Sequence, residues 1–278
     1  MKTMLVPCEH FDALDSTLIC AYLFASRFGC HIEGVALRPS FAEFVAVDPI
    51  SAASLPPVDW PNEESLRKTR AVFDGFMTRK GVPIAGAERK GAGFAWSDQE
   101  PMTDGDLASH ARAFDIVVTS RPGSGEHATR MSTLEAILFE SGRPTLIAPP
   151  KTVNELGRNV LIAWNSSTET ARTIAFAMPV LEKAERVTVL SVEGGMVPGP
   201  SGEELARNLA ANGVPVTVLN VKPGRQTTGE AILANTTALG CDLIIKGAYT
   251  QSRLRQWIFG GATSHLLASA ELPIFMAH

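Results

Sequence analysis

The residues whose types and spacing best suit a chemical task lie between Gly247 and Thr263, in the segment GAYTQSRLRQWIFGGAT. This segment joins a short apolar run at 242–246, typical of a buried strand, to a run with helical character. A glycine-punctuated loop in this position can bind phosphate, because main-chain N–H groups point at the anion and the helix dipole favours negative charge. Arg253 and Arg255 would add guanidinium groups, which match phosphate oxygens. Alternatively, the glycines only permit tight turns beside a helix.

A second polar position, Asn165, directly follows another strand-like run at 159–164. Its amide offers a donor and an acceptor, and these could hydrogen-bond a ligand at this strand end. The alternative is a structural role at the start of a helix, where Asn and Ser are favoured caps. Because Ser166 and Glu169 fit a capping box, we expect Ser166 to cap this helix.

The sequence shows no pattern that would indicate catalysis or a metal site. The six histidines form no HExxH or closely spaced Cys/His pattern, and neither GxSxG nor GxxxxGK[ST] occurs. The nearest approach to a metal cluster is Glu9 with His10 and Asp12, which we interpret as a solvated turn. We therefore predict no catalytic residue and no metal ligand.

The composition of the 278-residue chain narrows the class of protein. Apolar residues make up 45% of it, which is normal for a globular protein with a sizeable core. A net charge of −4 argues against nucleic acid or an anionic membrane surface as the main partner. The four cysteines form no CxxC pair, which is typical of a reducing compartment. No run of about 18 apolar residues occurs. We expect a cytoplasmic protein that binds neither nucleic acid nor a membrane.

The chain contains an internal repeat, because four short segments of its first half recur in the same order in its second half. The matches are Thr3–Val6 with Asn159–Ile162, Gly81–Ile84 with Gly213–Val216, Phe114–Val118 with Cys241–Ile245, and Arg143–Ile147 with Leu272–Met276. This order predicts two domains, at 1–150 and 156–278, joined by a proline-containing linker. The first domain carries an apolar insertion at about 38–60, which either packs over its own domain or contacts a partner.

Each half alternates strands with helices, a pattern that predicts βαβ units and a parallel sheet with helices on both faces. In the first half we expect strands near 3–7, 31–37, 83–88, 115–119 and 144–147, and helices near 13–28, 62–79, 103–113 and 131–141. In the second half we expect strands near 159–164, 187–192, 216–221, 242–246 and 273–276, and helices near 167–183, 203–212, 228–239 and 262–270.

Two five-stranded α/β repeats in one chain resemble a tandem universal stress protein. Nucleotide-binding members of that family carry the pattern G-x2-G-x9-G-[S/T] after the fourth strand. Here Gly247 matches the first glycine and Gly260 the third, whereas Thr250 stands at the second glycine and Gly261 at the Ser/Thr position. The resemblance covers essentially the whole chain, and the loop matches at two of its four key positions.

The resemblance implies the strand order 3-2-1-4-5 in each half and a pseudo-two-fold axis between the halves. Family dimers meet through their fifth strands, which here are 145–148 and 274–277. In a tandem chain this contact is intramolecular, so that one chain suffices, although some tandem members associate further as homodimers. Antiparallel pairing of the two edge strands would satisfy their unpaired main-chain groups.

The resemblance also implies a ligand, an adenine nucleotide (ATP, ADP or AMP), with Mg²⁺ only where ATP is bound. We expect it in the second half, where the strand order reverses. The first-half loop at 119–131 is shorter, and Pro122 there lacks a main-chain donor. The predicted site residues are Asn165, Val192, Gly247, Thr250, Arg253, Gly260, Gly261, Ala262 and Thr263.

The function that follows is a non-catalytic stress-response protein with a nucleotide site in its second domain. An alternative is a scaffold that binds no nucleotide and works through the insertion at 38–60. A third reading, an ATP hydrolase or nucleotidyl-transfer enzyme, has the least support, because no catalytic group stands out in the sequence.

Overall fold

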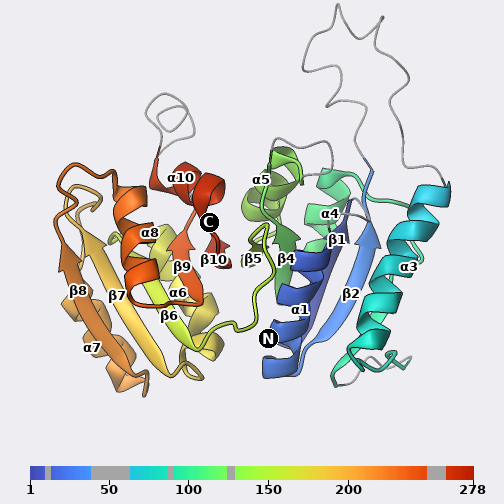
Figure 1. The fold of residues 1–278 in the computed structure, drawn as a ribbon, viewed down its shortest axis with the longest axis horizontal. Coiled ribbons are helices and arrows are strands. Elements are labelled where there is room, and N and C mark those ends of the chain that lie inside the picture. The colour runs from blue at the N-terminus through green and yellow to red at the C-terminus, as the bar shows by residue number, and fades with distance from the viewer. Residues whose placement is uncertain (10–13, 39–62, 87–90, 124–128, 249–260) are drawn as a thin grey trace, which may run out of the picture.

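The strands that the structure describes form one continuous sheet with the order β3-β2-β1-β4-β5-β10-β9-β6-β7-β8 (Figure 1). The computed structural model describes residues 1–9, 14–38, 63–86, 91–123, 129–248 and 261–278. The first-half strands are β1 (Thr3–Cys8), β2 (His31–Ala36), β3 (Gly93–Trp96), β4 (Ile116–Ser120) and β5 (Thr145–Ala148). The second-half strands are β6 (Asn159–Trp164), β7 (Arg186–Val192), β8 (Val216–Val221), β9 (Leu243–Gly247) and β10 (Ile274–Ala277).

The helices cover both faces of this sheet. One face packs against α1 (Asp15–Phe28), α3 (Glu63–Arg79), α6 (Thr168–Leu181) and α7 (Gly202–Ala211), which share one apolar cluster across both halves. The other face packs against α4 (Asp104–Ala111), α5 (Met131–Glu140), α8 (Thr228–Ala238) and α10 (Ala262–Ser269). These helices lie within one or two residues of their predicted positions. The α/β class and the repeat predicted from the sequence pattern, and the strand order implied for each half by the resemblance, are therefore confirmed.

The two halves meet through their fifth strands, as expected from the resemblance. β5 and β10 pair antiparallel, with Ile147 opposite Ile274 and Thr145 opposite Met276. All the other pairs of neighbouring strands are parallel, so this one junction joins two parallel half-sheets into a single sheet. Pairing here satisfies the main-chain groups that would otherwise be exposed at two sheet edges.

A second contact between the halves lies at the carboxyl ends of α1 and α6. The Arg27 guanidinium donates a hydrogen bond to the Lys183 carbonyl, and the Lys183 ammonium donates one to the Arg27 carbonyl. Carbonyls in the last turn of a helix have no partner within the helix, and cations are favoured beside them. Each half therefore caps a helix end of the other.

The third strand of the first half is the one element that sequence analysis placed wrongly. It was expected near 83–88, but β3 is Gly93–Trp96, and Ile84 forms only an isolated bridge to Phe94. The reason is packing. The rings of Phe94 and Trp96 contact Phe73 of α3, with centroids 5.9 and 5.4 Å away, whereas Ile84 is 79% exposed. The later segment thus buries more apolar surface against the helix.

Alternation along β9 decides which of its side chains face the site. Leu243 and Ile245 belong to the cluster on the α6 face, whereas Ile244 belongs to the cluster formed with α8 and α10. Because successive side chains of a strand point to opposite faces, Lys246 lies on the α10 face with Ile244. Gly247 then falls on the α6 face.

Candidate functional site

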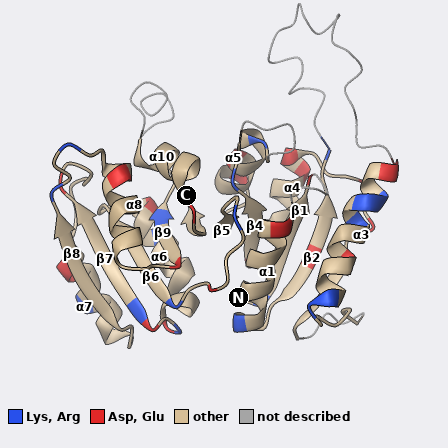
Figure 2. Ribbon diagram, in the orientation of Figure 1, with Lys and Arg blue, Asp and Glu red and all other residues tan. Residues whose placement is uncertain are grey.

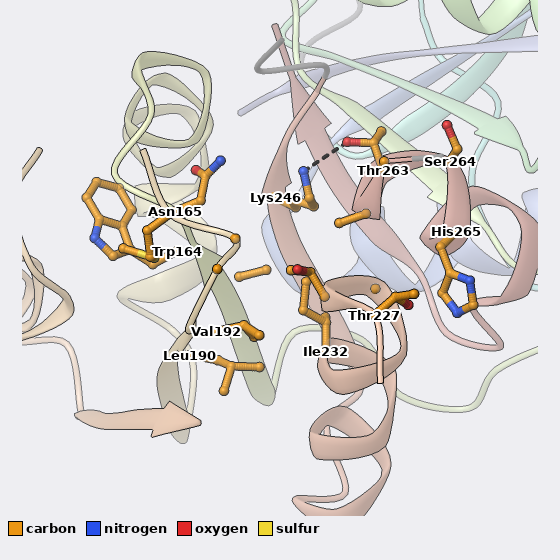
Figure 3. Close-up of a pocket in the computed structure, with 18 of the residues that line it drawn as sticks. Trp164, Asn165, Leu190, Val192, Thr227, Ile232, Lys246, Thr263, Ser264 and His265 are labelled. Atoms are coloured by element: carbon orange, nitrogen blue, oxygen red, sulfur yellow. Dashed lines mark hydrogen bonds between the residues drawn. The ribbon is translucent and has the colours of Figure 1, made fainter. Parts of the chain in front are cut away.

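A pocket of about 600 Å³ opens at the carboxyl ends of β6, β7 and β9 (Figure 3). β6 is the first strand of the second half, and the chain runs outward from it to β7 and β8 before it returns to β9 on its other side. This is the reversal of strand order at which ligands bind in open α/β sheets. Strand ends supply one side of the pocket, and the N-termini of α8 and α10 supply the other.

One wall of the pocket is apolar. Leu190 and Val192 of β7 and Ile232 of α8 are each at most 3% exposed, and Figure 3 shows their side chains grouped together. Ala163 of β6 also lines the pocket. An apolar wall with a few convergent polar groups is the usual composition of a small-molecule site.

The charged group of the pocket is Lys246, which sequence analysis did not identify. It is 5% exposed and is the last residue but one of β9, the blue segment of that strand in Figure 2. Its Nζ donates hydrogen bonds of 2.9 Å to the Gly247 carbonyl and of 2.9 Å to Thr263 Oγ1. Within the described residues no carboxylate lies at ion-pair distance from Nζ. Burial lowers the pKa of this ammonium to about 8, and the Glu169 carboxylate opposes that shift.

The N-terminus of α10 adjoins this ammonium. Its N-cap residue is Gly261, which has no side chain that could accept a hydrogen bond from the first turn. The N-terminus of α8, by contrast, is closed by a capping box between Thr227 and Glu230. The first N–H groups of a helix have no partner within the helix, and the helix dipole favours an anion beside them. An uncapped helix end and a buried ammonium thus meet at one end of the pocket.

Asn165 lies in the pocket, but its side-chain oxygen already has a structural role. It accepts hydrogen bonds from the Ser167 main-chain N–H at 3.3 Å and from Thr170 Oγ1 at 2.7 Å. The predicted cap was one residue off. Ser167 is the N-cap of α6 and accepts from the Thr170 N–H, whereas Ser166 has a φ of 65° and donates to the Pro200 carbonyl. With Ser167 as N-cap, the Glu or Gln of a capping box would have to stand at position 170, which is a threonine. The predicted capping box with Glu169 therefore does not form.

Gly247 lies outside the lining of the pocket. A Cβ at this position would come within 2.4 Å of the Thr170 main-chain nitrogen and within 2.6 Å of the Glu169 carbonyl carbon. The position therefore needs glycine for a close approach of β9 to the N-terminus of α6. Gly247 therefore serves packing, which is neither the phosphate-binding role nor the tight-turn role expected from the sequence, since its φ is not positive.

The structure brings five of the nine predicted site residues together. Three others, Thr250, Arg253 and Gly260, lie outside the described residues, as do the His10 and Asp12 of the turn considered above. Sequence analysis missed the buried lysine and the α8 face of the pocket. The one available signal was the alternation of side chains along β9, which places Lys246 on the same face as Ile244 in an otherwise apolar strand. The predicted residues that line the pocket are Asn165, Val192, Gly261, Ala262 and Thr263.

The equivalent position in the first half holds an internal ion-pair cluster. Arg130, the N-cap residue of α5, lies 2.7 Å from Glu9 and 2.9 Å from Asp104. Thr133 Oγ1 donates to Asp104 at 2.9 Å. Burial raises the pKa of the Glu9 carboxyl, and the nearby Arg130 opposes that rise. The cluster places the chain's own carboxylate at a helix N-terminus.

No group of three or more His, Cys, Asp or Glu side chains that could hold a metal occurs among the described residues. No helix within the described parts of the chain is both long and apolar enough to cross a membrane.

Comparison with known proteins rests on structure. No protein-family model matches the chain, and no curated protein sequence matches it. A universal stress protein from Archaeoglobus fulgidus DSM 4304 superposes with a TM-score of 0.64 and 15% identity, over 99% of this chain and 95% of that chain. A putative universal stress protein from Pseudomonas aeruginosa UCBPP-PA14 gives 0.54 and 14%, over 100% and 93%. A functionally unknown protein from Pseudomonas aeruginosa PAO1 gives 0.53 and 13%, over 100% and 92%. The chain therefore has the fold of a tandem universal stress protein.

Proposed function

We propose that this protein is a non-catalytic stress-response protein that binds an adenine nucleotide in the pocket of its second half. The observation that carries the proposal is the meeting, in one pocket, of the buried Lys246 ammonium, the uncapped N-terminus of α10 and an apolar wall. The first two features attract an anion, and the third suits a nucleobase. The stress-response part of the proposal comes from the fold, since two of the structural relatives are named as universal stress proteins.

The described residues fit a phosphate-bearing ligand. Gly261, Ala262 and Thr263 begin α10 and would hold phosphate oxygens through main-chain N–H groups, with Lys246 supplying positive charge. Leu190, Val192 and Ile232 would contact the base. Bound ATP would bring Mg²⁺ on its own phosphates.

Binding without turnover is the simplest function for this lining. The described residues of the pocket include no aspartate or glutamate that could act as a general base or hold a metal. The ATP hydrolase or nucleotidyl-transfer reading therefore stays the weakest candidate. The scaffold alternative depends on the insertion at 38–60, nearly all of which lies outside the described residues, and it stays a hypothesis.

The test is direct. The purified full chain is denatured, and released nucleotide is sought by mass and absorbance, while fresh protein is titrated with ATP, ADP and AMP. We expect retained nucleotide or saturable binding, with no ADP formed from ATP over several hours. The absence of both retained nucleotide and binding at millimolar concentration would remove the proposal. Steady release of ADP would replace it with the hydrolase.

A further inference from the structure

We infer that the Lys246 ammonium binds the anionic group of the pocket's ligand directly, and that ligand binding draws a proton onto Lys246. The inference rests on the proposed function for the identity of the ligand, an adenine nucleotide, but the chemistry of the contact requires only a phosphate group.

The position of Lys246 is the first support. The residue lies near the carboxyl end of β9, on the face shared by α8 and α10, at 5% exposure, and it lines the pocket. Figure 3 shows its side chain directed at Thr263, in the space between Asn165 and α10. An ammonium has three N–H donors, and the two neutral oxygens of Gly247 and Thr263 accept two of them. Among the residues that the structure describes, this leaves one donor for a ligand beside the helix N-terminus.

The charges around Lys246 are the second support. The Glu169 carboxylate of α6 favours the charged form of Lys246 and so opposes the fall in pKa caused by burial, but it does not lie at ion-pair distance. From α10, His265 lines the pocket, and from α8, Glu230 lies near that histidine. The main-chain N–H groups at the start of α10 add further positive potential. Within the described residues Lys246 is thus a buried cation that no carboxylate neutralises, which is costly unless an anion binds.

The coupling to protons follows from this charge balance. Burial holds the pKa of Lys246 at about 8, so that part of the free protein carries a neutral amine just above neutral pH. A phosphate placed beside the amine favours the charged form and raises its pKa. Binding near or above pH 8 must therefore take up a proton, and affinity falls as pH rises through that range.

The experiment titrates the full-length protein with ATP, AMP, adenosine and inorganic phosphate at pH 7.5 and 9.5. Both values lie above the last phosphate pKa of ATP and AMP, about 6, so the charge of these two ligands stays nearly constant and the pH comparison is made with them. Calorimetry in two buffers of different ionisation enthalpy counts the protons taken up. For wild-type protein we expect ATP affinity to fall on the order of tenfold between the two pH values, with adenosine unaffected.

Two variants at the site and one control separate charge from shape. Lys246→Met keeps the length of the side chain and removes its charge, so ATP should bind at least tenfold more weakly at pH 7.5, while adenosine binds as before. Lys246→Arg keeps a charge that does not titrate in this range, so it should retain ATP binding and lose the pH dependence. Lys222→Met removes an exposed lysine outside the pocket lining and controls for net charge. Thermal unfolding confirms that each variant folds.

The outcomes separate this inference from the proposed function. If ATP binds the wild type and Lys246→Met equally, with an unchanged pH slope, the inference is wrong and the proposed function stands. If inorganic phosphate binds in a Lys246-dependent way but no adenine nucleotide does, the inference stands and the proposed function is wrong. If neither phosphate nor nucleotide binds at millimolar concentration, both are wrong.

Discussion

The Glu9 carboxylate contacts Arg130 twice: Oε1 lies 2.7 Å from the guanidinium Nε, and Oε2 accepts the Arg130 main-chain N–H at 3.3 Å. Arg130 is the N-cap of α5, as Gly261 is the N-cap of α10 in the second half. Glu9 follows β1 as Asn165 follows β6. In the second half this helix N-terminus faces a pocket. In the first half the corresponding position is occupied by the Glu9 carboxylate and the Arg130 guanidinium.

Removing this arginine should destabilise the protein in a pH-dependent way. In Arg130→Met the buried Glu9 and Asp104 carboxylates lose their shared cation, and we expect a loss of about 3 kcal/mol at pH 7.5. The pKa of Glu9 is already raised by burial and would rise further. A group whose folded-state pKa is raised costs stability above its unfolded pKa, so the deficit should shrink between pH 7.5 and pH 5. Urea denaturation at both pH values measures this.

The control for that variant is Arg67→Met. Arg67 lies 3.9 Å from Glu63 on the exposed surface of α3, with 73% of its side chain accessible. Its removal should cost less than about 0.5 kcal/mol at either pH. Equal losses in the two variants would contradict a structural role for the first-half cluster.

Lys246→Met should make the protein more stable at neutral pH. The pKa of Lys246 is lowered to about 8 by burial, so below that value the folded state carries a desolvated charge that the unfolded chain exposes to water. We expect a gain on the order of 2 kcal/mol at pH 7. The gain should shrink as pH rises from 8 towards the ordinary lysine pKa, because the wild-type lysine then becomes neutral on folding. Thermal and urea unfolding from pH 7 to 10 test this, and a destabilised variant at pH 7 would refute it.

A matched pair at the α10 N-cap isolates charge at the proposed phosphate position. Gly261 has φ −77° and ψ 162°, an extended conformation that any residue adopts. Asp and Asn are both favoured N-caps, so either replacement should change stability by only about 0.3 kcal/mol. Gly261→Asp should abolish ATP binding through like-charge repulsion, whereas Gly261→Asn should weaken it less. Equal affinity of the two variants for ATP, measured by calorimetry, would place the phosphates elsewhere.

Gly247→Ala tests whether the first glycine of the loop serves packing. The added methyl would overlap the main chain of Thr170, and we expect a loss of about 2–3 kcal/mol through overpacking. Gly105→Ala in α4, where a Cβ meets nothing within 4 Å, should be neutral or slightly stabilising. Thermal unfolding of both variants is the measurement. An unchanged melting temperature in Gly247→Ala would show that the strand and helix can separate.

The positions of most strands were predictable because they follow from local pattern, whereas the order of the strands in the sheet came from the resemblance. The repeated Asp-Ile-Val and Asp-Leu-Ile runs at 115–117 and 242–244 mark the fourth strand of each half, and the alternation with helices fixes a parallel sheet. The third strand was misplaced because Ile84 and Phe94 both lie in strand-like segments. Only the packing against Phe73 of the preceding helix, α3, decides between them.

Part of the pocket lining was predictable from the sequence, but its charged residue, Lys246, was not. Helix N-termini and strand ends follow from spacing and from the resemblance, so Asn165, Val192 and Gly261–Thr263 were predicted, and all of them line the pocket. The cap at Ser167 could not be separated from Ser166, since the choice depends on a left-handed φ at a non-glycine residue. Lys246 was overlooked because a lysine at a strand end usually reaches solvent, and its burial depends on how α10 packs over it.

The antiparallel junction of β5 and β10 has a consequence for how such a protein can change over generations. In an assembly of two identical chains, every substitution appears twice, so a lysine at one pocket would also stand at the other. Here the partner is covalently attached and encoded separately, and a substitution appears once. One half has a salt-bridged arginine where the other has a glycine, and neither residue has to suit both halves.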